Sequence, residues 1–288
     1  MQKSIKKYFP IFALPTFIAF TIGFIVPFLM GIYLSFCKFT TVTDAKFVGF
    51  SNYTKIFTDA TFLHALWYTA LFTIVSVVLI NVLAFVIAML LTKGIRGTNI
   101  FRTVFFMPNL IGGIVLGYIW QLILNGILAK FGRTLVYSPT YGFWGLVILM
   151  CWQQVGYMMI IYISGLNSIP DSLYEAARVD GATRGQILRR ITLPMMMPSI
   201  TICTFLTLTN SFKLFDQNLA LTAGEPGIQT AGNTIYSTEM LALNIYNTFY
   251  QNANTRGVGQ AKAVIFFILV AVIALAQLYA TRRKEVQQ

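Results

Sequence analysis

Long apolar stretches alternate with short polar segments along the whole of this chain. Six stretches near 20 residues or longer contain no Asp, Glu, Lys or Arg. A helix needs about 20 apolar residues to cross the hydrocarbon core of a bilayer. The expected spans are Ile11–Phe36, Ala65–Leu91, Val104–Leu124, Phe143–Leu166, Ile191–Phe212 and Ala263–Ala280. The pattern therefore predicts an all-α, polytopic membrane protein with six transmembrane helices.

Several prolines interrupt this apolar pattern. A proline inside a helix removes one backbone hydrogen bond, and in a membrane neighbouring groups must replace it. The prolines that fall in or at the ends of the expected spans are Pro15, Pro27, Pro108, Pro194 and Pro198. We expect kinked helices that pack against one another.

Basic residues gather in every second segment between the spans. These residues are Lys3, Lys6, Lys7, Lys93, Arg96, Arg102, Arg178, Arg184, Arg189, Arg190, Arg282, Arg283 and Lys284. Because short cytoplasmic segments carry the excess of Lys and Arg, we expect both termini in the cytoplasm. The outer loops then lie near residues 37–64, 125–142 and 213–262.

The same distribution gives the domain organisation. We expect a cytoplasmic segment of residues 1–10, a transmembrane domain of residues 11–281 and a basic cytoplasmic tail of residues 282–288. The transmembrane domain includes a cytoplasmic loop, residues 168–190, between spans four and five. The expected location is the plasma or inner membrane.

Composition supports this assignment and narrows the chemistry. The chain is 57% hydrophobic and 10% charged, whereas a soluble domain is about 25% charged. Its formal net charge of +12 is spread over short loops, which argues against nucleic acid as a partner. Cys37, Cys151 and Cys203 lie in or beside apolar stretches and lack the spacing of a metal site or a disulfide framework. We expect them to pack as small apolar side chains.

The sequence lacks the residues of an ATPase or an acid–base enzyme. No Gly-rich phosphate loop ending in Gly-Lys-Ser or Gly-Lys-Thr is present, so any ATP must be bound by another chain. The single histidine, His64, lies beside an expected outer boundary, and the spans hold no carboxylate for general acid or base catalysis. We expect a packing role for His64, and a transport subunit that is not an enzyme and holds no metal.

The loop between spans four and five reads as two short helices joined by a turn. Ser172 to Glu175 has the spacing of a capping box, and Thr183 to Gln186 repeats it. Gly181 between them permits a tight turn.

Small residues on the first of these helices suggest a docking surface. Ala176 and Ala177 stand beside the charged Glu175 and Arg178. Small side chains allow another protein's backbone to approach closely, and the flanking charges fix its orientation.

The complete pattern of this loop resembles the EAA signature of binding-protein-dependent ABC permeases. Glu175-Ala-Ala is followed by three residues and Gly181, then by nine residues and Ile191-x-Leu193-Pro194. In that family the loop forms a coupling helix seated in a cleft of the ATPase subunit. The resemblance implies that the ATPase-coupling residues are Glu175, Ala176, Ala177, Asp180, Gly181, Ile191, Leu193 and Pro194.

Three further segments resemble the sugar-importing members of that family, the permeases of the maltose, lactose, multiple-sugar and raffinose type. They are Phe47–Tyr53, Phe101–Pro108 and Ser211–Asp216. The segment Leu221–Pro226 departs from the family's Leu-Thr-x-Gly-Gly-Pro, because Glu225 replaces the second Gly. The resemblance implies the fold of a type I ABC importer permease.

The resemblance also implies the partners. They are a second homologous permease, two cytoplasmic ATPase subunits that bind ATP and Mg, an extracellular solute-binding protein, the lipid bilayer and a sugar. The carried solute is expected to be a neutral di- or oligosaccharide, for example an α-galactoside such as raffinose. This chain is expected to bind no cofactor itself.

A path for a neutral sugar needs amide, hydroxyl and aromatic side chains, because polar groups orient hydroxyls and rings stack on sugar faces. Each candidate also has a plain alternative role in helix packing or interfacial anchoring. Lys213 and Asp216 are three residues apart, and we predict an ion pair between them. The candidates are Tyr118, Trp120, Gln121, Trp152, Gln153, Gln154, Tyr157, Asn210, Lys213 and Asp216.

Two alternatives stay open on the sequence alone. One is an ABC permease for another solute, such as glycerol phosphate or a polyamine. The other is an ion-coupled secondary carrier, which is also a bundle of broken helices around a central site. Proton-coupled carriers usually place Asp, Glu or His inside the membrane, and the expected spans contain none of these.

Overall fold

The computed structural model describes residues 2–94, 96–230 and 233–282. The predicted basic tail therefore lies outside the described residues, except for Arg282. The chain divides into two compact units. Unit 1 contains Met1–Asp59 and Ile245–Ile268, and unit 2 contains Ala60–Asn244 and Leu269–Gln288.

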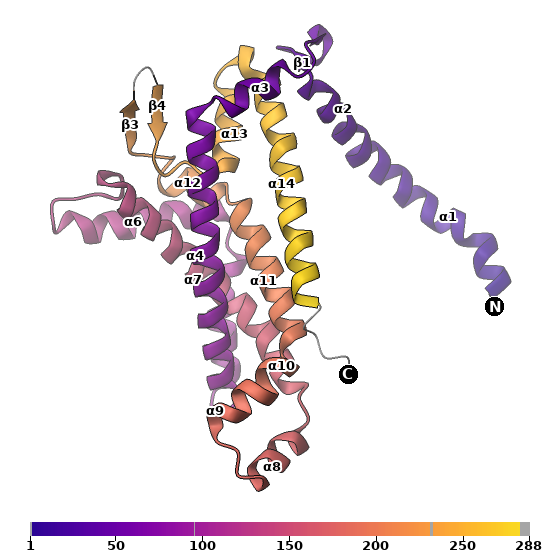
Figure 1. Cartoon of the computed structure of the whole chain (residues 1–288), viewed down its shortest axis with the longest axis vertical. Helices are drawn as coiled ribbons and strands as arrows, with labels where there is room; N and C mark the ends of the chain where they lie inside the picture. Colours follow the sequence, from indigo (N-terminus) through magenta and orange to yellow (C-terminus); the bar gives the residue numbers. More distant parts are fainter. Residues whose placement is uncertain (1, 95, 231–232, 283–288) are drawn as a thin grey trace. The chain divides into compact units, whose positions relative to one another are not determined.

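Helices dominate both units (Figure 1). The elements of the first half of the chain are α1 (Gln2–Phe20), η1 (Thr21–Ile25), α2 (Val26–Ser35), β1 (Cys37–Lys38), η2 (Val42–Asp44), β2 (Lys46–Phe47), α3 (Ser51–Phe57), α4 (Ala60–Leu91), α5 (Thr98–Phe106), η3 (Met107–Leu110), α6 (Gly113–Ala129) and η4 (Leu135–Tyr137). Those of the second half are α7 (Pro139–Asn167), α8 (Asp171–Val179), α9 (Arg184–Ile187), η5 (Leu188–Thr192), α10 (Leu193–Met195), α11 (Met197–Phe212), α12 (Asp216–Leu221), β3 (Gly227–Thr230), β4 (Asn233–Tyr236), α13 (Leu241–Tyr250), η6 (Ala253–Thr255) and α14 (Arg256–Arg282).

Four continuous helical stretches are long and apolar enough to cross a membrane. They are Ile11–Ser35, Ala60–Leu91, Pro139–Asn167 and Ala253–Arg282. They confirm the first, second, fourth and sixth predicted spans, with ends that differ by up to ten residues. The first stretch contains a π-helical turn, η1, which ends two residues before Pro27.

The third predicted span, Val104–Leu124, is not one straight helix. The helices of Thr98–Leu110 and Gly113–Ala129 meet at 103°. Pro108 lies in the 3-10 turn η3, and Gly112 has extended backbone angles, so the α-helical hydrogen bonds stop there. Side chains stay apolar through the bend, which is why hydropathy alone predicted a continuous span.

The fifth predicted span, Ile191–Phe212, is bent as well. Arg184–Met195 and Met197–Phe212 meet at 68°. Pro194 and Pro198 stand on either side of the bend, and neither can donate a backbone hydrogen bond. The predicted kinks therefore occur at Pro108, Pro194 and Pro198.

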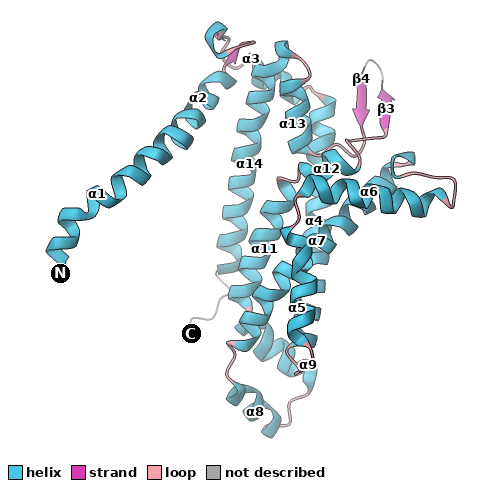
Figure 2. Ribbon diagram, turned by 180° about the vertical axis from the view of Figure 1, so that it is seen from behind, coloured by secondary structure: helices cyan, strands magenta, loops and turns pink. Residues whose placement is uncertain are grey.

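The core of unit 2 is formed by α4, α7 and α11, which pack side by side (Figure 2). Polar side chains join the three helices inside this apolar core. The Tyr162 hydroxyl of α7 donates to Asn81 Oδ1 of α4 at 2.6 Å, and Asn81 Nδ2 donates to Thr207 Oγ1 of α11 at 2.9 Å. Helix α5 also reaches α7 closely, because a Cβ on Gly156 would stand 1.8 Å from the carbonyl oxygen of Phe105.

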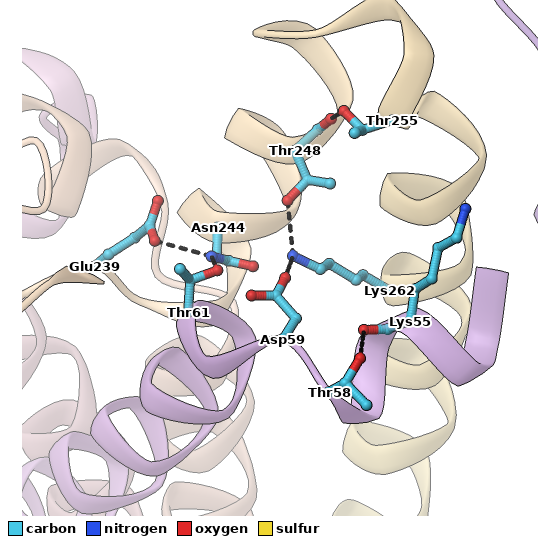
Figure 3. A network of polar contacts seen from close by, with 9 residues as sticks. All are labelled: Lys55, Thr58, Asp59, Thr61, Glu239, Asn244, Thr248, Thr255 and Lys262. Atoms are coloured by element: carbon cyan, nitrogen blue, oxygen red, sulfur yellow. Dashed lines mark hydrogen bonds and ion pairs between the residues drawn. The ribbon is translucent and has the colours of Figure 1, made fainter. Parts of the chain in front are cut away.

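Unit 1 is held together by polar contacts around its small sheet and its buried lysine. Asn52 Nδ2 donates to the carbonyl oxygen of Cys37 at 2.9 Å. Lys262 Nζ lies 2.8 Å from Asp59 Oδ2 and donates to Thr248 Oγ1 at 2.8 Å (Figure 3). The Lys262 side chain is only 1% exposed. A buried ammonium needs such partners, because an uncompensated buried charge is strongly destabilising.

Two short antiparallel hairpins modify the predicted all-α class. In unit 1, β1 pairs with β2, and in unit 2, β3 pairs with β4. Both lie in segments predicted as outer loops. The β3–β4 hairpin and helix α8 lie at opposite ends of unit 2 (Figure 1).

The histidine and the cysteines take structural positions. His64 Nε2 lies 3.1 Å from the carbonyl oxygen of Ser237, and its ring stacks on Tyr68. Cys37 and Cys203 are buried, Cys151 is half-buried, and all three are free thiols. Among the described residues no group of three or more His, Cys, Asp or Glu is placed to hold a metal ion.

Candidate functional site

The predicted docking surface lies on α8 and the turn that follows it. Glu175 and Ala176 are exposed, and Ala177 is half-buried. Asp180 and Gly181 are exposed directly after the helix ends. Gly181 has a φ of +74°, and that left-handed conformation confirms the predicted turn.

Only one of the two predicted capping boxes forms. Thr183 and Gln186 cap α9: the backbone N–H of Thr183 donates to Gln186 Oε1 at 2.7 Å, and that of Gln186 donates to Thr183 Oγ1 at 3.4 Å. The box predicted at Ser172 and Glu175 is wrong. Helix α8 begins at Asp171, and Pro170 stands at the N-cap without a side-chain acceptor. Ser172 is thus already inside the helix, and the Glu175 side chain extends into solvent.

The second half of the signature is tied to the first. Ile191, Leu193 and Pro194 are half-buried in η5 and α10, where the chain enters α11. The Tyr174 hydroxyl of α8 lies 3.4 Å from the Thr192 hydroxyl of η5. Sequence reasoning did not single out this pair, because neither residue belongs to the signature. The contact links the docking helix to the start of the fifth span.

Amide side chains converge between α7, α11 and α12. Gln217 Nε2 donates to Gln153 Oε1 at 2.7 Å, and Asn210 Nδ2 donates to Gln154 Oε1 at 3.3 Å. Gln153 Nε2 also donates to the carbonyl oxygen of Ile111 at 3.4 Å, at the bend before α6. We call Gln153, Gln154, Asn210 and Gln217 the amide cluster.

A cavity of about 220 Å³ lies beside the amide cluster. It is lined by Met150, Gln154, Asn210, Lys213, Leu214, Phe215, Asp216 and Gln217. The structure thus brings together five of the predicted path residues, Gln153, Gln154, Asn210, Lys213 and Asp216. It adds Gln217, which the sequence placed in an outer loop.

The other predicted path residues do not line this cavity. Tyr118 is exposed, and Gln121 Nε2 donates to the carbonyl oxygen of Leu221 at 3.0 Å. Trp120 and Trp152 meet edge to face, with ring centroids 5.5 Å apart. Tyr157 stands against Phe106, with centroids 6.3 Å apart. These contacts are those of helix packing.

The predicted ion pair between Lys213 and Asp216 is wrong. Lys213 caps the end of α11, and Asp216 begins α12, so the two residues do not share one helical face. Among the described residues neither forms an ion pair within 4.0 Å. Both instead line the cavity, which therefore carries one cationic and one anionic side chain.

Two glycines of α6 position α12 and hence Gln217. A Cβ on Gly117 would stand 2.5 Å from Ala220 Cβ, and a Cβ on Gly113 would stand 2.7 Å from Asp216 Cβ. The spacing Gly-x-x-x-Gly allows this close approach between helices. Any larger side chain would move α12 away from the cavity.

The turn with the unusual Glu225 closes without the second Gly of the family pattern. Gly224 has a φ of +89°, and Glu225 Oε2 accepts a hydrogen bond from the backbone N–H of Gly227 at 2.7 Å. The carboxylate thus holds the start of β3. The departure at Glu225 is accommodated locally.

Comparisons with known proteins agree on one family. The family described as "Binding-protein-dependent transport system inner membrane component" matches residues 80–286. The chain is 43% identical over 286 residues to the "Probable starch degradation products transport system permease protein AmyD" of Thermoanaerobacterium thermosulfurigenes, covering 96% of this chain and 94% of that protein. It is 31% identical to the "Multiple sugar-binding transport system permease protein MsmF" of Streptococcus mutans, covering 99% of both.

A solved structure shares the fold over nearly the full length. It is the crystal structure of a bacterial ABC transporter involved in the import of the acidic polysaccharide alginate, with a TM-score of 0.78 and 23% sequence identity. The likeness covers 98% of this chain and 98% of that chain. At this identity it shows the arrangement of the helices alone.

Proposed function

The chain belongs to the binding-protein-dependent transport system inner membrane components and is the permease of an ABC sugar importer, and we propose that it carries a neutral di- or oligosaccharide. It is a multi-pass membrane protein and a transport subunit, and not an enzyme. In such systems the ATPase is a separate subunit. The ion-coupled carrier considered from the sequence is therefore excluded.

The observation that carries the proposal is the composition of the cavity beside the amide cluster. Gln154, Asn210 and Gln217 supply donors and acceptors that suit sugar hydroxyls. Lys213 and Asp216 contribute opposite charges to the same cavity, so its formal charge is balanced. A charged solute gains little net electrostatic attraction from such a site. A neutral solute can instead exchange hydrogen bonds between its hydroxyls and the amides.

The relatives bear on the class of sugar. AmyD is described as a permease for starch degradation products, and starch fragments are neutral glucose oligomers. We therefore favour a neutral α-glucan oligosaccharide among the neutral sugars, and an α-galactoside such as raffinose remains a second candidate. The alginate transporter carries an acidic polysaccharide, so an acidic oligosaccharide is the contrary outcome that the test must include.

Uptake measurements test the substrate. The complex, reconstituted with its cognate binding protein, is given labelled maltotriose, raffinose, an alginate trisaccharide, glycerol phosphate and a polyamine at equal concentration. ATP-dependent uptake of a neutral oligosaccharide in preference to the charged solutes is expected. Preference for a charged solute would refute the neutral assignment and leave the family assignment intact.

The exposed face of α8 supports a proposal for the partners. We infer that Glu175, Ala176 and Ala177 dock into a cleft of a cytoplasmic ATPase subunit, which binds ATP and Mg. A second permease, another ATPase subunit and an extracellular binding protein complete the importer. The Tyr174–Thr192 contact then passes the movement of the docked helix to the fifth span.

The orientation of the chain follows from the same proposal. Helix α8 faces the ATPase in the cytoplasm, both termini are cytoplasmic, and the β3–β4 hairpin lies outside. A cysteine replacing Arg184 should react with an impermeant maleimide from the cytoplasmic side only, and a cysteine replacing Gln229 from the outer side only. Reaction of both from the same side would contradict the orientation.

A further inference from the structure

The segment that leads into the fifth span lies at a steep angle to that span. Arg184–Met195 meets α11 at 68°. Transmembrane helices tilt by about 20° on average from the bilayer normal. A segment at 68° to such a helix therefore runs close to the membrane surface, where the lipid headgroups are.

The composition of this segment suits that position. The half-buried apolar residues Ile187, Leu188 and Ile191 flank the two exposed cations Arg189 and Arg190. Amphipathic helices with Arg or Lys on the polar face lie in the interface and are attracted to anionic lipids. The segment leads directly into α11, which keeps it near the end of that span.

A cavity of about 510 Å³ opens on this segment. It is lined by Thr183, Gly185, Gln186, Leu188, Arg189 and Arg190. The lining thus includes two arginines, a threonine and a glutamine, and it contains no acidic residue. In the capping box Gln186 uses its Oε1 atom, which leaves its NH₂ group as a further donor.

No carboxylate of the described residues neutralises these two arginines. Arg189 and Arg190 form no ion pair within 4.0 Å in the described parts of the chain. Arg190 also lines a neighbouring cavity of about 320 Å³ that contains Asp180, but the two side chains are not paired. A planar guanidinium matches the geometry of a phosphate, and two of them make a strong site for one.

We propose that this cavity binds the phosphate headgroup of an anionic phospholipid, with Arg189 and Arg190 as its principal ligands. Leu188 faces the same cavity and suits the apolar part of the lipid. The lipid holds the segment that joins α9 to α11 at the membrane surface. None of the residues that line this cavity belongs to α8, although Arg190 also lines the neighbouring cavity that contains Ala177 and Asp180.

Lipid retention by the whole importer tests the proposal. The complete complex is reconstituted in nanodiscs that contain phosphatidylglycerol and phosphatidylcholine, extracted, and analysed for lipid bound per complex. The wild type should retain phosphatidylglycerol in preference to phosphatidylcholine. Arg189→Gln and Arg190→Gln should each reduce the retained phosphatidylglycerol about fivefold, as expected for one cation at an anionic surface.

Arg178→Gln is the matched control, since it removes one exposed cation from the same loop outside the cavity. It should retain phosphatidylglycerol as the wild type does. Equal loss in Arg178→Gln would show that general loop charge attracts the lipid and would overturn the site. Unchanged retention in both cavity variants would overturn it as well.

Two other outcomes separate the lipid from competing anions. If inorganic phosphate binds the complex in phosphatidylcholine discs with the same arginine dependence, and no preference for phosphatidylglycerol appears, the site takes a soluble phosphate and the lipid proposal fails. If the cavity variants lose ATPase subunits while their phosphatidylglycerol content is unchanged, the arginines face protein carboxylates, and the lipid proposal fails again.

Discussion

The loop of residues 168–190 and the amide cluster are connected by α7 and α11 but differ in construction. Helix α7 carries Gln153 and Gln154 and ends where the loop begins, and α11 follows the loop and carries Asn210 near its far end. Along α7, Gln154 is 13 residues from the end of the helix at Asn167, or about 20 Å. Helix α7 therefore connects the two regions directly, whereas a bend of 68° separates the loop from α11.

The exposure of the two regions is opposite. Glu175, Ala176 and Asp180 of the loop are open to solvent, with few contacts inside the chain. Gln153 and Gln154 are 6% and 8% exposed and are hydrogen-bonded across helices. The loop exposes its signature residues, whereas the amides of the cluster are hydrogen-bonded to one another within the chain.

This contrast predicts which step of transport a substitution in each region should affect. A substitution in the loop should alter coupling between ATP hydrolysis and transport without altering sugar affinity. A substitution in the amide cluster should do the reverse.

Glu175→Lys is expected to cause the largest loss. It reverses a charge on the exposed face of α8, and juxtaposed like charges at an interface cost several kcal/mol. Uptake by the reconstituted importer should fall roughly a hundredfold, while membrane insertion is retained. Ser172→Lys places the same cation on the same helix outside the signature and should transport normally. Wild-type uptake by a fully assembled Glu175→Lys complex would contradict the docking role.

Gln153→Leu should weaken sugar binding about tenfold. The change keeps the side-chain volume but removes the acceptor of the half-buried Gln217 and the donor to the Ile111 carbonyl oxygen, and each lost hydrogen bond costs about 0.5–1.5 kcal/mol. The apparent KM for sugar uptake should rise while the ATPase activity stays coupled.

Gln121→Leu is the comparison for this change. It also removes an amide, but one that is bonded to the carbonyl oxygen of Leu221 away from the cavity. Its KM should be close to that of the wild type. An equal rise in KM for both variants would show that the amide cluster has no special part in the path.

Gly181→Ala should have a moderate effect confined to the loop. An L side chain in the left-handed conformation costs about 1 kcal/mol or more, although a Cβ there would meet no atom within 4 Å. Coupling should fall roughly fivefold, as measured by sugar transported per ATP hydrolysed. Gly185→Ala, at a glycine without positive φ and with equally open space, should be neutral. An equal loss of coupling in Gly185→Ala would indicate that added side-chain volume, and not backbone strain, causes the effect.

Lys213 and Asp216 should show the smallest effect. Because the structure does not pair them, Lys213→Gln, Asp216→Asn and the double variant should give a coupling energy below about 0.5 kcal/mol in neutral-sugar uptake. The double variant should also transport a neutral sugar at close to the wild-type rate. A larger coupling energy would restore the ion pair predicted from their spacing.

Local sequence features were sufficient for the loop. The turn at Gly181 and the cap at Thr183 depend on neighbouring residues, so their spacing predicted them correctly. The box at Ser172 failed because Pro170 takes the N-cap position and the helix starts two residues earlier than that box requires. Hydropathy likewise found the spans, because a bilayer selects for long apolar stretches wherever they lie.

The amide cluster could be predicted only in part, because it is assembled by tertiary packing. Amides in the spans suggested a path, but nothing local distinguished Gln154 from Gln121. Gln217 reaches the cluster because α12 folds back onto Gly113 and Gly117 of α6. The 103° bend before α6 cannot be predicted from hydropathy either, because the side chains on both sides of it are apolar.

The ion pair between Lys262 and Asp59 sets an order for biogenesis. Residue 59 leaves the ribosome long before residue 262, and unit 1 needs both, since it combines Met1–Asp59 with Ile245–Ile268. The ion pair between Asp59 and Lys262 can therefore form only after all of Ala60–Asn244 has been synthesised. When Lys262 of α14 is synthesised, Asp59 is already present in the chain as its counter-charge. Completion of unit 1 is therefore a late event in synthesis, because a nascent chain that ends before residue 245 lacks the second part of the unit.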